Sequence, residues 1–175
     1  MTSSSQQQVV NRYRGARTDP DLAVLEGFHA LKHALRFGAD VLEIRAADPG
    51  RLDDLAAELA PEIADEVSRR AVETPDDLFD RLAPRRPATG VIALARRREA
   101  DPPEVIASTA PRPVVLLERP SHLGNLGAAV RSAAAAGAAG LVATGEHDPW
   151  HASALRGAAG LHYALPVGRA PDLGA

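Results

Sequence analysis

The sequence contains no cysteine and very few aromatic residues. Among its 175 residues Cys is absent, and Phe, Trp and Tyr together make up 3%. The absence of cysteine excludes disulfide bonds, thiolate nucleophiles and cysteine-ligated zinc. No apolar run approaches the ~20 residues that span a bilayer, and residues 1–8 are polar, so neither a membrane helix nor a secretory signal peptide is predicted. We therefore expect a cytoplasmic protein whose core is built mainly from Ala, Leu, Val and Ile.

Lysine is also nearly absent. Of the 20 Lys and Arg residues only Lys32 is a lysine, and 23 Asp and Glu residues bring the net charge to −3. A chain with this balance does not attract nucleic acid through its overall charge. Arginine suits phosphate binding and stacking on bases. However, the parallel enrichment in Ala, Gly and Pro favours GC-rich coding DNA as the origin of the arginines.

Residues 9–98 are predicted to form an α/β domain after a disordered tail at residues 1–8. A helix is predicted from Asp21 to Leu35, where apolar residues recur at a spacing near 3.6 and Gly38 ends the pattern. The other predicted elements of this domain are strands at 40–45 and 90–95 and helices at 49–60 and 61–70. The charged, proline-containing residues 99–112 are predicted to be a linker.

Residues 113–175 are predicted to begin a second α/β domain with a parallel sheet, because short apolar strands alternate with helices. The strands are predicted at 113–117, 140–143 and 163–167, and the helices at 128–136 and 151–159. The first strand is continuously apolar, as expected for a strand buried on both faces of a sheet. Because three strands and two short helices bury little surface, we expect this domain to be incomplete at residue 175.

The loop between the first strand and helix of the second block points to ligand binding. It reads Glu118-Arg-Pro-Ser-His-Leu-Gly-Asn-Leu-Gly127, and a glycine-rich strand-to-helix turn can present backbone N–H groups to a phosphate. The GxGxxG and GK[ST] patterns are both absent. Arg131 is predicted to lie in the first turn of the helix, where a cation opposes the helix dipole. This placement favours a ligand-binding role for Arg131, and the alternative is an arginine that only faces solvent.

Other polar residues give weaker signals. His122, His147 and His151 have no metal-ligand spacing with carboxylates, so no metal site is predicted. Ser121 lacks the GxSxG context of a hydrolase nucleophile. Trp150 either stacks on a base or packs in the core. The remaining candidates are arginines that either contact phosphates or are simply solvated, at positions 12, 14, 17 and 96–98.

Two stretches of the second block carry a family resemblance. Residues 117–137, LERPSHLGNLGAAVRSAAAAG, resemble motif 1 of the SpoU (TrmH-like) RNA 2′-O-ribose methyltransferases, members of the trefoil-knotted SPOUT class. Residues 148–167, DPWHASALRGAAGLHYALPV, are similar to a second motif of that family. In the first block, Leu25-Glu26-Gly27 and residues 88–93 (ATGVIA) resemble the ribosomal-protein-L30e-like domain that precedes the knot in many of these enzymes.

The resemblance implies an RNA 2′-O-ribose methyltransferase that acts on rRNA or tRNA, takes its methyl group from S-adenosylmethionine (AdoMet) and forms a homodimer. It assigns Arg131 to activation of the ribose 2′-hydroxyl, Asn125 to the shaping of the same pocket, and Glu118 to an acidic position of motif 1. Because the pKa of free arginine exceeds ~12, Arg131 is expected to polarise the hydroxyl, and whether it also takes the proton stays open.

Members of this family continue beyond the second motif with further strands and a third motif, which supply most of the AdoMet pocket and of the dimer interface. We therefore assign no cofactor-binding residue and expect the 175-residue chain to bind no AdoMet. The alternative function is that of a truncated, catalytically inactive relative that only binds RNA through residues 9–98. The DNA downstream of codon 175 would discriminate between the two.

Overall fold

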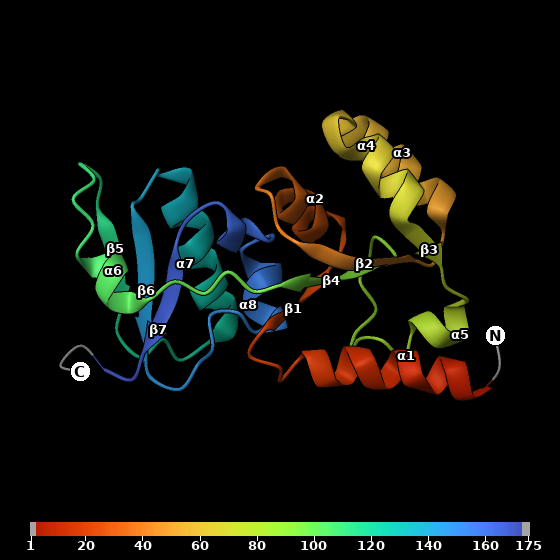
Figure 1. The fold of residues 1–175 in the computed structure, drawn as a ribbon, viewed down its shortest axis with the longest axis horizontal. Coiled ribbons are helices and arrows are strands. Elements are labelled where there is room, and N and C mark those ends of the chain that lie inside the picture. Colours follow the sequence, from red (N-terminus) through yellow and green to blue (C-terminus); the bar gives the residue numbers. More distant parts are fainter. Residues whose placement is uncertain (1–2, 173–175) are drawn as a thin grey trace.

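The computed structural model describes residues 3–172, which contain one mixed and one parallel β-sheet with helices packed on them (Figure 1). This architecture confirms the predicted α/β class and the parallel sheet of the second block. None of the helices within residues 3–172 is long and apolar enough to cross a bilayer.

The N-terminal half of the chain alternates strands and helices. Its elements are α1 (Ser3–Ala16), β1 (Leu22–Glu26), α2 (Phe28–Arg36), β2 (Val41–Ala46), α3 (Pro49–Leu59), α4 (Pro61–Arg70), β3 (Ala71–Glu73), α5 (Asp76–Phe79) and β4 (Val91–Arg96). The sheet order is β1-β4-β2-β3, with β4 antiparallel to both of its neighbours. The predicted strands at 40–45 and 90–95 and the predicted helices at 49–60 and 61–70 are confirmed to within one residue.

Alternate residues of the central strand β4 face two separate apolar cores. Ala93 packs with residues of α2, α3 and α4, whereas Ile92 and Leu94 pack with residues of α1 and α5. Figure 1 shows α1 along one side of this sheet and α2, α3 and α4 on the other. Burial on both faces explains why β4 is a continuous apolar run in the sequence.

The predicted disordered tail is wrong for residues 3–8, which form the start of α1. Val10, Tyr13 and Ala16 recur every three residues along α1 and are buried in the second apolar core. The apolar residues that anchor this helix all lie in its second half, so the polar Ser and Gln run that precedes them has the composition of a tail. Residues 1 and 2 lie outside the described part of the chain.

The helical assignment of residues 3–16 can be tested at Gly15. A Cβ atom there would meet nothing within 4 Å, so Gly15→Ala should raise the free energy of unfolding by about 0.5 kcal/mol through helix propensity. Urea unfolding measures the change. The matched variant is Gly137→Ala, at a position that also has no close neighbours but has φ 67°. Because a left-handed backbone strains a residue with a Cβ atom, this variant should lower the free energy of unfolding by about 1 kcal/mol. An unchanged stability in Gly15→Ala would contradict the helix.

The helix predicted from Asp21 to Leu35 is wrong in its first third, where β1 lies instead. Val24 and Leu25 are both buried because β1 pairs with β4 and is covered on its two faces. Gly27, at φ 96°, then forms the turn between β1 and α2. At the start of α2 the N–H of Phe28 donates a hydrogen bond to Thr89 Oγ1 at 2.9 Å. The apolar spacing of β1 happens to continue the period of α2, so periodicity alone merges the two elements.

The C-terminal half contains the parallel sheet. Its elements are α6 (Pro102–Ile106), β5 (Val114–Leu117), α7 (Leu123–Ala135), β6 (Gly140–Thr144), α8 (Ala152–Gly157), the 3-10 helix η1 (Leu161–Tyr163) and β7 (Val167–Ala170). The sheet order is β5-β6-β7. The predicted linker at 99–112 thus contains a helix, and Glu99 forms a bridge with Val167.

Helix α7 begins at Leu123, five residues before its predicted start at Ala128. Gly124 and Gly127 indicate a loop in the sequence, but in the structure both lie within α7, and Gly127 lets this helix approach α8 closely. A Cβ atom at Gly127 would lie 2.2 Å from the carbonyl oxygen of Ala154, a distance that no side chain tolerates. Gly127 therefore serves helix packing rather than a turn.

Two strands of the second sheet also differ from their prediction. The third strand lies at Val167–Ala170 rather than at 163–167, because Tyr163 packs in the first apolar core and Pro166 has no N–H for a sheet hydrogen bond. Strand β5 is only half-buried, with Leu116 47% exposed, because it forms an edge of the sheet rather than its centre.

The two halves of the chain share a packed junction. Trp150, Leu155 and Tyr163 belong to the same apolar cluster as residues of α2, β2 and β4. The hydroxyl of Tyr163 donates to the carbonyl of Arg96 at 2.9 Å. Trp150 is 1% exposed, so of its two predicted roles the structure gives it core packing. The second half is therefore held against the first by a continuous core, which fixes the position of α7 relative to α2.

Candidate functional site

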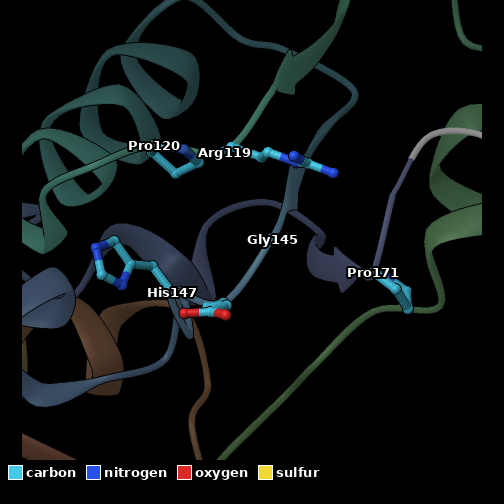
Figure 2. Close-up of a pocket in the computed structure, with 6 residues that line it drawn as sticks. Arg119, Pro120, Gly145, His147 and Pro171 are labelled. Atoms are coloured by element: carbon cyan, nitrogen blue, oxygen red, sulfur yellow. The ribbon is translucent and has the colours of Figure 1, made fainter.

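The carboxyl ends of β5, β6 and β7 lie at one edge of the parallel sheet, where open α/β folds bind ligands. A pocket of about 590 Å³ opens there, within the size range of small-ligand sites. It is lined by residues that follow the three strands, namely Arg119, Pro120, Gly145, Glu146, His147 and Pro171. Figure 2 shows Arg119 and Pro120 on one side of this space and His147 on the other.

Two turns interlock to build this pocket. Arg119 has φ 44°, a left-handed conformation, and its N–H donates to Oγ1 of the buried Thr144 at 3.0 Å. Gly145 has φ 88°, and a Cβ atom there would lie 3.1 Å from Cγ of Arg119. Nε2 of His147 lies 3.0 Å from the carbonyl oxygen of Ser121 and joins the same two turns. The loop after β5 is therefore anchored to the loop after β6, and the Arg119 side chain projects from a held backbone.

Arg131 lies in the third turn of α7, not in its first turn as predicted, because the helix begins eight residues earlier at Leu123. In the third turn the Arg131 charge lies too far from the N-terminus of α7 to oppose the helix dipole, whose effect falls off within the first turn. Arg131 is exposed and forms no ion pair or hydrogen bond with any residue in the range 3–172. Its charge acts on α2, where the pKa of His29 is lowered by burial first, and then by Lys32 and Arg131.

The other two predicted site residues, Asn125 and Glu118, are exposed as well. Asn125 lies in the first turn of α7, six residues before Arg131, which corresponds to roughly 9 Å along the axis and about 120° around it. Glu118 directly follows β5, beside the pocket residue Arg119. No hydrogen bond or ion pair within residues 3–172 joins any two of the three, so their assignment to one site stays a prediction.

Most of the arginines predicted as phosphate contacts have partners inside the protein. Arg97 is 8% exposed in its side chain, pairs with Asp148 at 2.8 Å and donates to the carbonyl of Leu22. Arg98 donates to the carbonyl of Gly38, beyond the end of α2, and lies 5.7 Å from the ring centre of Tyr163. The others with partners are Arg12, Arg17 and Arg96, which pair with Glu43, Glu26 and Asp40. Of this group, only Arg14 has neither an ion pair nor a side-chain hydrogen bond among the described residues.

Two residues on α2 were not predicted from the sequence, namely His29, on which the charge of Arg131 acts, and Lys32, which acts on the same imidazole. Their three-residue spacing places them on one side of a helix, but this pattern is hidden when β1 and α2 are read as one long helix. For metal binding, the described part of the chain holds no cluster of three or more His, Asp or Glu side chains.

Comparison with known sequences finds a family match in the C-terminal half of the chain. The sequence model of the SpoU rRNA methylase family matches residues 112–175. No curated protein matches the chain. Among solved structures, the SpoU methyltransferase AviRb from Streptomyces viridochromogenes, in complex with AdoMet, has 26% sequence identity and a TM-score of 0.73, covering 99% of this chain and 65% of its own.

Two further structures have lower identity and show the fold alone. An AdoMet-bound rRNA methyltransferase from Sinorhizobium meliloti is 21% identical with a TM-score of 0.69, and an RNA 2′-O ribose methyltransferase is 23% identical with a TM-score of 0.68. Each alignment covers 97% of this chain and 62% or 63% of the other, so the chain spans less than two thirds of these relatives. Residues 112–175 thus match the SpoU rRNA methylase family, and the chain as a whole is similar in fold to solved SpoU methyltransferases.

Proposed function

We propose that this protein is an AdoMet-dependent RNA methyltransferase that modifies a ribose 2′-hydroxyl in rRNA or tRNA, with Arg131 as the residue that acts on this hydroxyl. The observation that carries the proposal is the exposed Arg131 within the matched segment, which has no acidic partner among the described residues and whose charge acts on His29 of α2. A cation left unpaired in a chain of net charge −3 is available to a polyanionic ligand.

Arg131 suits the activation of a hydroxyl but not its full deprotonation. A guanidinium keeps its protons at neutral pH, since its pKa exceeds ~12. Hydrogen bonds from it to the 2′-oxygen would stabilise the negative charge that develops as the hydroxyl loses its proton. The proton itself then leaves to water or to another group. Asn125 and Glu118 would act around this centre by orienting the ribose.

The pocket beside β5, β6 and β7 does not by itself fit AdoMet. The methyl donor carries a positive sulfonium, yet the lining contains the cation Arg119, and Glu146 is its one carboxylate among the described residues. Among the described lining residues, His147 is the one aromatic side chain that could stack on adenine. The described residues form at most one wall of a donor site, and we derive no step through the donor.

Methyl transfer from tritiated AdoMet to ribosomal RNA tests the proposal, because a 2′-O-methyl group makes the adjacent phosphodiester resistant to alkali. The assay should use this chain and a chimaera in which the C-terminal part of AviRb follows residue 172. We expect tritium in alkali-resistant dinucleotides with the chimaera. RNA binding without transfer by either protein would instead support the alternative of a catalytically inactive RNA-binding relative.

A further inference from the structure

Helix α2 presents a basic side to solvent at the junction of the two halves. Its buried side consists of Phe28, Ala30, Leu31 and Ala34. Apart from Leu35, the remaining positions carry the basic residues His29, Lys32, His33 and Arg36, which follow the i, i+3, i+4, i+7 spacing of one helix side. Arg36 donates to Glu62 at 2.7 Å through Nε, so part of this basic side is neutralised. His29 and Lys32 are not paired in this way.

The turn between α8 and η1 holds α2 in place relative to α7. Nδ1 of His33 donates to the carbonyl of Ala159 at 2.7 Å. A Cβ atom at Gly160, which has φ 76°, would lie 2.4 Å from the carbonyl oxygen of Ala30, so the two backbones are in direct contact. Residues of η1 contact both α2 and α7. The side chains that α2 and α7 direct to solvent therefore keep a fixed relative position.

The charges at this junction are uncompensated. Neither Lys32 nor Arg131 has a carboxylate within 4.0 Å among residues 3–172, and both act on His29, whose lowered pKa keeps its imidazole neutral at pH 7. Lys32 acts at longer range on Glu62, which Arg36 already holds. Elsewhere many of the arginines pair with acidic side chains, as in the pairs of Arg12, Arg17, Arg45, Arg86, Arg97 and Arg156. Two unpaired cations beside a neutral imidazole repel each other unless an anion lies between them.

We infer that Lys32 and His29 on α2 and Arg131 on α7 form one RNA-binding surface across the junction, in which the Lys32 ammonium binds a backbone phosphate next to the ribose that Arg131 acts on. This inference rests on the proposed function and names the substrate contacts of that same site. Lys32 supplies affinity without sequence preference, as phosphate contacts do. The neutral imidazole of His29 can both donate and accept a hydrogen bond, so it suits the ribose or a base edge.

The single lysine of the sequence makes the inference directly testable. An amine-selective acetylating reagent can label only Lys32 and the α-amino group, and mass spectrometry separates the two. With fragmented ribosomal RNA bound to the 175-residue chain, we expect the labelling rate of Lys32 to fall several-fold while that of the α-amino group is unchanged. Duplex DNA of equal length is the second arm, and equal protection by both would overturn a surface specific for RNA.

Binding measurements with Lys32→Gln complete the test. This variant should bind RNA more weakly and reduce the slope of log affinity against log salt by about one. Arg69→Gln, which removes an exposed charge from α4, is the matched control and should bind as the parent chain does. Unprotected Lys32 and unchanged affinity in Lys32→Gln, with RNA bound, would overturn the surface and leave the methyltransferase proposal intact. Failure of the parent chain to bind RNA would overturn the surface too, and methyl transfer by the chimaera would then decide the proposed function separately.

Discussion

Arg131→Ala should reduce methyl transfer to RNA at least ~100-fold, the usual scale for a group that assists proton transfer from a reacting hydroxyl. The reason is that no other cation on α7 could replace it, since Arg131 is the sole basic residue in Leu123–Ala135. RNA affinity should fall far less, because Lys32 and the rest of the surface remain. Single-turnover transfer of tritium into alkali-resistant dinucleotides, measured with the chimaera at saturating RNA, separates the two effects.

Two variants serve as controls for this result. Arg131→Lys keeps the charge but loses the planar pair of donors, so its rate should fall between those of the parent and of Arg131→Ala. Asn125→Ala should show a smaller loss than Arg131→Ala, because Asn125 lies about 120° away around α7 by helix geometry. Near-normal turnover in Arg131→Ala would remove Arg131 from the mechanism.

The protein should lose about 3 kcal/mol of stability between pH 6.5 and pH 4 through the single side chain of His162. His162 is fully buried beside Trp150, with ring centres 5.2 Å apart, and neither ring nitrogen makes a hydrogen bond of good geometry. Burial lowers the pKa of His162 to about 4, and the nearby Pro149 carbonyl and Asp148 offset only part of that effect.

Stability falls toward acid pH because the unfolded chain binds a proton at His162 more readily than the folded protein does. The unfolded chain binds a proton at His162 below pH ~6.5, whereas the folded protein binds it only near pH 4. The stability that the neutral, buried His162 allows is therefore fully present above pH 6.5 and is lost as the pH falls from 6.5 to about 4. Urea unfolding at pH 7 and at pH 4.5 should show a smaller acid loss in His162→Leu than in the parent. His122→Leu, at an exposed loop position, should keep the full loss, and equal losses in all three proteins would show that His162 does not titrate in this way.

Several features of this protein were predictable from local sequence alone. The strands of the second block and their parallel order follow from short apolar runs separated by helical segments, and β5 and β6 lie within one residue of their predicted bounds. The family resemblance rested on contiguous residues around Asn125 and Arg131, which a sequence shows directly. The absence of cysteine settled the exclusion of thiol chemistry without any structure.

Helix boundaries were less predictable because glycine has two uses. At Gly27 a glycine lies between two elements, because the turn from β1 into α2 requires a positive φ. At Gly127 a glycine lies inside α7, because the backbone of Ala154 on α8 leaves no room for a side chain. Both residues read identically in the sequence, and only the position of a second helix distinguishes them.

The sequence by itself determined the class of fold, the resemblance of residues 112–175 to the SpoU family and the presence of an arginine at position 131. Only the tertiary structure decided which cations are free to bind RNA, because their partners are distant in the chain. Arg97 reaches Asp148 across 51 residues and Arg98 reaches the carbonyl of Phe37 across 61, so both are occupied. Arg131 and Lys32 have no such partner among the described residues, and both act on His29 across the junction where the backbones of Ala30 and Gly160 touch. No local pattern encodes that contact, since it depends on how two separately predicted halves pack against each other.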